Sequence, residues 1–146
     1  MSSVSQLLED FEFLDDWEDR YRYVIELGRE LCPLTDEQRS AENKVQGCVS
    51  QVWLDTTVDR TTPESPVLTF VGDSDAHIVR GLIAVLFRVF SGQTAQHILE
   101  TDAIAMFASM GLDDHLTPQR SNGLRSMVER IRRDAQAALQ HAPAAS

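Results

Sequence analysis

The sequence is poor in lysine, in cysteine and in long apolar runs. Of 146 residues, 13 are Lys or Arg and 23 are Asp or Glu, which gives a formal net charge of −10. Binding to nucleic acids depends on clustered basic side chains, so this balance excludes DNA and RNA as expected partners. The longest apolar run, from Gly81 to Phe87, is far shorter than a bilayer span, and the N-terminus lacks the pattern of a secretory signal. We therefore expect a cytoplasmic protein without a membrane partner.

Cysteine and histidine are also scarce, which limits the available chemistry. The two cysteines, Cys32 and Cys48, are expected to be free thiols, because a reducing compartment disfavours disulfides. No histidine forms a short metal-binding spacing with another histidine or a cysteine. The chain has neither a glycine-rich phosphate loop nor a nucleophile elbow. We expect no metal site and no resident cofactor.

Apolar residues repeat at helical spacing near both ends of the chain. Ser3 and Gln6 form a capping-box pattern ahead of a first helix. A second apolar stripe begins at Trp17 and is expected to stop before Pro33, because proline disfavours helix in the residue that precedes it. Thr117-Pro118 supplies an N-cap and a first-turn proline for a long last helix.

A helix over residues 78–90 is predicted to lie at the centre of the fold. Its apolar residues point in nearly every direction, so it must be buried on most sides. Gly81 lowers helix propensity by about 1 kcal/mol relative to Ala, and we expect it to permit close backbone packing against a sheet. Two short helices follow, with N-caps predicted at Thr94 and Thr101, and Gly111 is expected to close the second.

Two segments, 50–58 and 67–71, are rich in β-branched and aromatic residues and are predicted to be strands. The stretch 59–66 between them contains two prolines, which favours an antiparallel hairpin with a long, mobile loop. Residues 72–75, Gly-Asp-Ser-Asp, are interpreted as a turn that caps the central helix with acidic groups. The sequence therefore predicts a small antiparallel sheet.

The remaining segments complete a single domain over residues 1–146. The polar stretch 34–43 is expected to be irregular apart from one short turn capped by Thr35. No repeat or shift in composition marks a second domain. The core is expected over about residues 7–139, and the tail 140–146 is expected to fray.

Cys48 is the candidate nucleophile. It lies between Gly47 and the start of a predicted strand, close to Lys44, and the reactivity of a thiolate depends on such access and local charge. An inert, buried cysteine fits the same spacing. A hydrolase site that combines Cys48 with His77 or His115 and with Asp75 is a further alternative, and the spacing alone does not choose among the three.

The segment from Gln46 to Trp53, QGCVSQVW, resembles the SufE family, the sulfur acceptors of bacterial iron–sulfur cluster assembly. The resemblance covers about residues 7–139. Further blocks resemble the family in the same order: WEDRY at 17–21, IELG at 25–28, GDSDA at 72–76, VRGLIAV at 79–85 and HLTPQRSNGL at 115–124. The resemblance to this family implies a compact α+β fold like that of IscU-type scaffolds, with a small antiparallel sheet packed against helices.

The resemblance also implies what Cys48 does. A SufS-like, pyridoxal-phosphate-dependent cysteine desulfurase would transfer persulfide sulfur to Cys48, and the Suf scaffold complex would accept it next. The protein would then be a component of a sulfurtransferase that stimulates the desulfurase, rather than a free-standing enzyme. Gln46 and Gly47 would shape the loop that carries the cysteine, and Asp75 and Arg120 are candidates for contact with the desulfurase or for lining the cysteine pocket.

Three questions stay open at this level. The chain could be a CsdE-type carrier that serves a different sulfur-transfer pathway, or an allosteric activator of a desulfurase that carries no sulfur. The oligomeric state is also undetermined, and a homodimer is compatible with the resemblance. A scaffold that builds clusters is disfavoured, because clusters are held by several thiolates and only Cys48 lies in a matching region.

Overall fold

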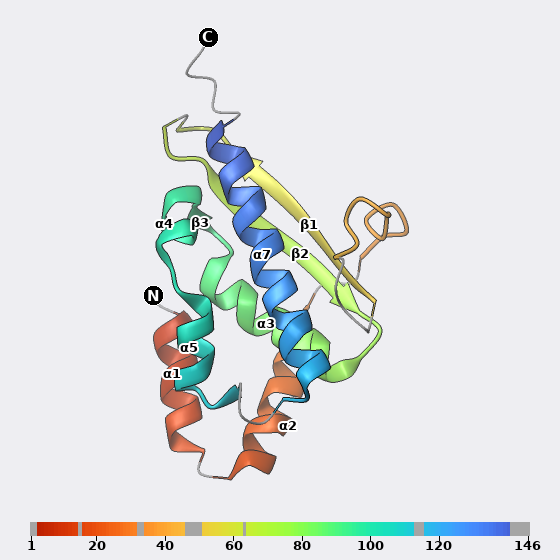
Figure 1. Ribbon diagram of the computed structural model, residues 1–146, viewed down its shortest axis with the longest axis vertical. Coiled ribbons are helices and arrows are strands. Elements are labelled where there is room, and N and C mark those ends of the chain that lie inside the picture. Colours follow the sequence, from red (N-terminus) through yellow and green to blue (C-terminus); the bar gives the residue numbers. More distant parts are fainter. Residues whose placement is uncertain are drawn as a thin grey trace.

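A computed structural model describes residues 3–14, 16–31, 34–45, 51–62, 64–112 and 116–140. Within them the chain forms six helices and a three-stranded antiparallel sheet, which confirms the predicted α+β fold (Figure 1). None of the described helices has the length and apolar content needed to cross a bilayer. The elements are α1 (Ser3–Phe13), α2 (Trp17–Gly28), β1 (Val52–Asp59), β2 (Val67–Ser74), α3 (His77–Phe90), β3 (Gln93–Thr94), α4 (Ala95–Glu100), α5 (Ala103–Ser109) and α7 (Pro118–Gln140).

The sheet contains the predicted hairpin and one strand that was not predicted. Strands β1 and β2 pair from Val52 opposite Ser74 to Asp59 opposite Val67. The third strand, β3, pairs with the start of β2 and is only two residues long, too short to produce a pattern in the sequence. Strand β2 continues to Ser74, three residues beyond the predicted end.

The prediction that residues 72–75 cap α3 is therefore wrong. Ala76 occupies the N-cap position, and it makes no side-chain capping bond. Asp73 is instead a strand residue whose carboxylate is bound by other groups, and Asp75 binds the backbone of Gln51. The carboxylates of Asp73 and Asp75 thus bind groups elsewhere in the fold rather than the N-terminus of α3.

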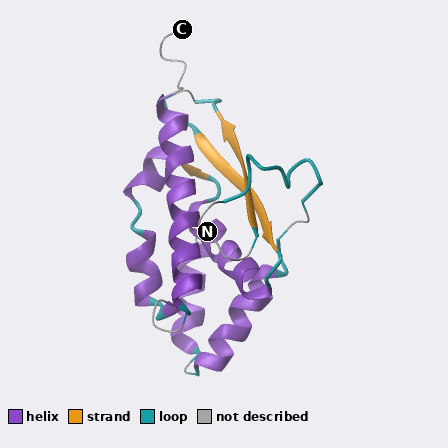
Figure 2. Cartoon of the chain, turned by 45° about the vertical axis from the view of Figure 1, so that its right-hand side comes forward, coloured by secondary structure: helices purple, strands orange, loops and turns teal. Residues whose placement is uncertain are grey.

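The two faces of the sheet have different neighbours. Val52, Leu54, Leu68 and Phe70 alternate along β1 and β2, are buried, and face the helices. Figure 2 shows the helices gathered on this side of the strands. Helix α3 lies at the centre of the core, with most of its residues buried, as predicted. The opposite face carries Trp53 and Asp73, and the segment 34–45 contacts it at Trp53, Asp55 and Asp73.

Helices α2 and α3 cross at very close range. A Cβ atom placed on Gly81 would lie 2.1 Å from the carbonyl oxygen of Val24, and one on Gly28 would lie 2.7 Å from the backbone nitrogen of Gly81. Both distances are shorter than any real Cβ contact. Gly81 does permit close backbone packing, but against α2 and not against the sheet, so the predicted neighbour is wrong.

Two helix boundaries differ from the predictions. Helix α2 ends at Gly28 rather than next to Pro33, because the chain tightens into successive i to i+3 hydrogen bonds from Arg29 onward. Asp102 caps α5 in place of Thr101, whose hydroxyl donates to the carbonyl of His97. Three other predicted caps are confirmed: Thr94 accepts from His97, Thr117 accepts from Arg120, and Gly111 follows α5 with a φ of +78°. The capping box predicted for Ser3 and Gln6 stays a prediction, and the Gln6 side chain donates to Asp10.

Candidate functional site

The central residues of the predicted site lie outside the described part of the chain. Cys48, Gln46 and Gly47 belong to residues 46–50, which we call the Cys48 segment, and Cys32 and His115 are also outside the described residues. The structure does describe the chain on both sides of the Cys48 segment. The upstream flank ends at Val45, and the downstream flank begins at Gln51.

The two flanks are hydrogen-bonded to each other. The backbone N–H of Val45 donates to the carbonyl of Val52 at 2.8 Å, and that of Leu54 donates to the carbonyl of Asn43 at 2.8 Å. Lys44 and Trp53 form an antiparallel bridge between these bonds. The chain therefore enters and leaves the Cys48 segment at neighbouring points at one end of β1.

Asp75 binds the first residue of the downstream flank. Its carboxylate accepts a hydrogen bond from the backbone N–H of Gln51 at 3.1 Å, and its own N–H donates to the carbonyl of Gln51 at 3.3 Å. This reciprocal pair joins Gln51 to the turn between β2 and α3. Asp75 is exposed, so its side chain lies at the surface next to Gln51.

Arg120 has a different environment. It lies in the first turn of α7, where its Nη1 donates to the hydroxyl of Tyr21 on α2 at 2.9 Å. No hydrogen bond or ion pair joins Arg120 to Asp75 in the part of the chain that the structure describes. The two predicted partner contacts are therefore held by separate interactions.

The segment 34–45 is organised by the turn predicted at Thr35. The Thr35 hydroxyl accepts from the N–H of Gln38 at 3.1 Å, and the Gln38 side-chain oxygen accepts from the N–H of Thr35 at 3.0 Å. This reciprocal capping pair confirms the short turn. The amide of Gln38 also donates to Asp55 on β1 at 3.2 Å, which attaches the turn to the outer face of the sheet.

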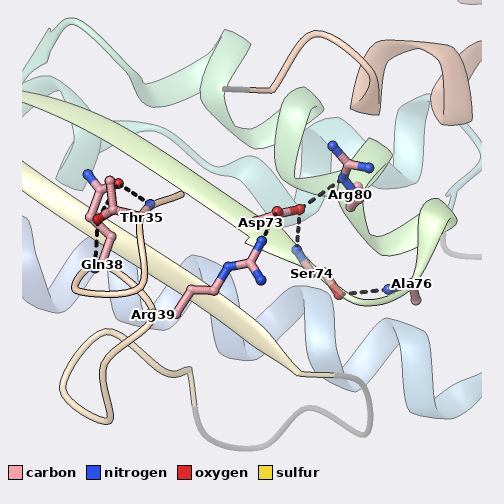
Figure 3. Close-up of polar contacts among 7 residues, drawn as sticks. All are labelled: Thr35, Gln38, Arg39, Asp73, Ser74, Ala76 and Arg80. Carbon is pink, nitrogen blue, oxygen red and sulfur yellow. Dashed lines mark hydrogen bonds and ion pairs between the residues drawn. The ribbon is translucent and has the colours of Figure 1, made fainter. Parts of the chain in front are cut away.

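Arg39, the residue after Gln38, belongs to a charged cluster with Asp73 and Arg80 (Figure 3). Asp73 is buried at the end of β2, and its carboxylate contacts two arginines: Nη2 of Arg39 at 3.0 Å and Nε of Arg80 at 2.9 Å. The Arg80 contact is an ion pair without hydrogen-bond geometry. The N–H of Ser74 donates to the same carboxylate at 2.8 Å. The Arg39 guanidinium also lies 5.4 Å from the ring centre of Trp53.

This cluster was not predicted from the sequence. The local pattern favours helix capping for Asp73 and does not single out Arg39. A signal was available, because aspartate is uncommon in strands and Asp73 follows the β-branched and aromatic run 67–71 after a single glycine. The pairing partner could not be found from the pattern, since Arg39 and Asp73 are 34 positions apart.

Metal binding finds no support among the described residues. No group of three His, Cys, Asp or Glu side chains in this part of the chain is arranged to hold a metal ion. Asp73 is already neutralised by two arginines, and Asp75 is bonded to Gln51. The described residues of this region offer charged and hydrogen-bonding groups along the two flanks, and the reactive thiol at Cys48 stays a prediction.

Known proteins with similar sequences place the chain in a family. Residues 5–135 match the SufE family, described as an Fe-S metabolism associated domain. An uncharacterized SufE-like protein of Rhizobium etli is 57% identical over 135 residues, which cover 92% of this chain and 90% of that protein. A second, from Rhizobium meliloti, is 54% identical over 139 residues, covering 95% of this chain and 99% of its own length.

One solved structure has a similar fold. The solution structure of a hypothetical protein from Thermus thermophilus aligns with a TM-score of 0.75 and covers 96% of this chain and 99% of its own. Its sequence identity is 20%, so the likeness concerns the fold alone. The family match spans most of the chain, both relatives exceed half identity, and the predicted resemblance is confirmed: the chain belongs to the SufE family, a domain associated with iron–sulfur metabolism.

Proposed function

We propose that this protein accepts sulfane sulfur on Cys48 from a cysteine desulfurase and passes it on for iron–sulfur cluster assembly. The observation that carries the proposal is membership in the SufE family over a stretch that includes Gln46-Gly47-Cys48. The donor would be a SufS-like, pyridoxal-phosphate-dependent enzyme, and the Suf scaffold complex would be the next acceptor. Removing sulfur from the donor would increase its turnover.

The arrangement of the flanks supports this role. Cys48 is three residues from Val45 and three from Gln51, so its Cα can be no more than about 11 Å from either. Both residues are fixed by hydrogen bonds at the same end of β1, where Asp75 is exposed. A donor that docks at this end of the sheet would have the thiol within reach, and Asp75 and Arg120 remain candidates for contact with it.

The transfer is a thiol exchange. The Cys48 thiol first loses its proton, and the thiolate attacks the outer sulfur of the donor's persulfide. A new S–S bond forms on Cys48, the donor's S–S bond breaks, and the donor cysteine leaves as a thiolate that takes up a proton. The next acceptor repeats the attack and regenerates the Cys48 thiol, so no external oxidant or reductant is consumed. Gly47, which has no Cβ, would allow the backbone beside the thiol to adjust during both steps.

Intact-protein mass spectrometry tests the proposal. The wild type, Cys48→Ser and Cys32→Ser are each incubated with a cysteine desulfurase and L-cysteine in the absence of reductant. We expect one added sulfur on the wild type and on Cys32→Ser, and none on Cys48→Ser. If the wild type gains no sulfur while the desulfurase turns over faster, the protein is an allosteric activator. Hydrolysis of a small acyl substrate without any partner would favour the Cys-His hydrolase instead.

A further inference from the structure

Three separate parts of the chain meet at the carboxylate of Asp73. Arg39 comes from the segment that leads to the Cys48 segment, Arg80 comes from α3, and Asp73 itself is paired with Trp53 in the register of β1 and β2. Arg39 also lies over the ring of Trp53 at 5.4 Å from its centre. The same few side chains thus join the upstream flank, the downstream flank and the central helix.

The burial of Asp73 makes this arrangement specific. Its side chain is only 10% exposed, and Asp73 and Ser74 are the two buried polar residues among those that the structure describes. A buried carboxylate must be compensated by charge and hydrogen bonds, which two guanidinium groups and the Ser74 N–H supply here. Without Asp73, the two arginines would repel each other, and Arg39 would lose the partner that fixes its orientation.

We propose that Asp73 and Arg39 are positioning residues for sulfur transfer. Asp73 orients the Arg39 guanidinium across Trp53, and this contact holds the two flanks of the Cys48 segment in the arrangement from which the thiol reacts. The inference rests on the proposed role of Cys48. Displacing reacting groups by about 1 Å can lower a rate about a hundredfold, so loosening the flanks should slow transfer within the complex more than it weakens docking.

The test is single-turnover sulfur transfer from a desulfurase already loaded with persulfide, followed by rapid quenching and mass spectrometry. The rate constant is measured against desulfurase concentration for wild type, Asp73→Asn, Arg39→Gln, Arg39→Lys and the double variant Asp73→Asn/Arg39→Gln. Arg88→Gln is the matched control, because Arg88, like Arg39, is a partly exposed arginine in an ion pair, with Glu30 at 2.8 Å, at the opposite end of α3 from Arg80. Thermal unfolding establishes that each variant is folded at the assay temperature.

We expect Asp73→Asn and Arg39→Gln each to lower the saturating rate about tenfold or more, with the half-saturating concentration changed by less than about twofold. The double variant should be no slower than the slower single variant, because both changes remove one shared contact. Arg39→Lys keeps the charge but not the planar group, so it should recover only part of the rate. Arg88→Gln should match the wild type.

Three results would overturn the inference. The first is a raised half-saturating concentration with an unchanged saturating rate, which would make the cluster a docking contact. The second is equal loss in Arg88→Gln, and the third is strictly additive loss in the double variant. If Asp73→Asn does not fold, Arg39→Gln decides, because the Arg39 side chain is 42% exposed. The proposed function fails separately, if wild type gains no sulfur or if Cys48→Ser still gains it.

Discussion

Helices α2 and α3 are held together by close packing, whereas the flanks of the Cys48 segment are held together by hydrogen bonds and ion pairs. At the helix crossing, Gly28 and Gly81 allow the two backbones to lie so close that a Cβ atom at either position would overlap a backbone atom of the other helix. At the flanks, Asp73 gathers two arginines, and Asp75 binds the backbone of Gln51. The first region should respond to changes in side-chain volume, and the second to changes in charge and hydrogen bonding.

The helix pair α2–α3 thus differs physically from the flanks of the Cys48 segment, the region proposed to take part in sulfur transfer. Close apolar packing has few alternative arrangements, because the neighbouring atoms cannot move without creating voids or clashes. Hydrogen bonds and ion pairs at a partly exposed site can be exchanged for bonds to water at smaller cost. At the flanks, the exposed contact of Asp75 with Gln51 can therefore be exchanged for water more readily than the contacts of the buried Asp73.

The largest effect is expected from Gly81→Ala. Its Cβ would meet the carbonyl oxygen of Val24, a backbone atom, so the helices must separate. The cost of such overpacking exceeds the gain of about 1 kcal/mol in helix propensity, and we expect a net loss of about 2 kcal/mol or more. Thermal unfolding followed by circular dichroism should show a Tm lower by about 5 °C or more.

Gly92→Ala provides the comparison for this variant. A Cβ atom on Gly92 would have no neighbour within 4 Å, but the φ of this residue is +81°, so alanine there costs only backbone strain of about 1 kcal/mol. The loss in Tm should be smaller than for Gly81→Ala. Equal losses at the two positions, or an unchanged Tm for Gly81→Ala, would contradict a crossing set by shape.

The sequence predicts the scaffold better than the flanks, for a physical reason. Helix α3 and the β1–β2 hairpin leave local signals, namely apolar residues at helical spacing and β-branched runs, and both are present as expected. The predicted neighbour of Gly81 is wrong, since a small residue indicates close approach but does not identify what approaches it. Which helices cross is decided by tertiary packing.

Contacts at the candidate site are less accessible to sequence reasoning because they join distant segments. Asp73 lies 34 positions from Arg39, and Asp75 lies 24 positions from Gln51. The local pattern indicates that both acids cap α3, where a carboxylate is also favourable. The turn at Thr35 is predicted correctly, because a capping pair involves residues only three apart. The role of Cys48 comes from a resemblance and stays a prediction.

An intermediate effect is expected from Asp75→Ala. The substitution removes the acceptor of the Gln51 N–H, and because Asp75 is exposed, water replaces part of the lost bond. We expect a local loss of about 1 kcal/mol, which corresponds to about fivefold faster hydrogen exchange of the Gln51 amide. Asp102→Ala is the matched control, because Asp102 also accepts a backbone N–H, that of Ala105, in α5. Slower or unchanged exchange at Gln51 would show that this bond does not hold the downstream flank.

The smallest effect is expected at Tyr23, where burial and a nearby charge both act on the pKa of one side chain. Tyr23 on α2 is partly buried, and its hydroxyl donates to the carboxylate of Asp10 on α1 at 2.6 Å. Burial, followed by this hydrogen bond and the charge of Asp10, raises the pKa of Tyr23 from 10.0 to about 12. Because the folded chain favours the protonated phenol, the resulting contribution to stability is complete below pH 10 and is lost as the pH rises through about 12.

Ultraviolet titration of tyrosinate separates the two causes. The difference between wild type and Tyr23→Phe isolates the titration of Tyr23, and its midpoint should lie near pH 12. Asp10→Asn removes the charge and the carboxylate acceptor but leaves the burial, so the midpoint should return only part of the way toward 10.0. A complete return would mean that the charge of Asp10 alone sets this pKa. An unchanged midpoint would mean that burial alone sets this pKa. The contact between α1 and α2 would then depend on packing, as the crossing of α2 and α3 does, and not on charge, as the flanks do.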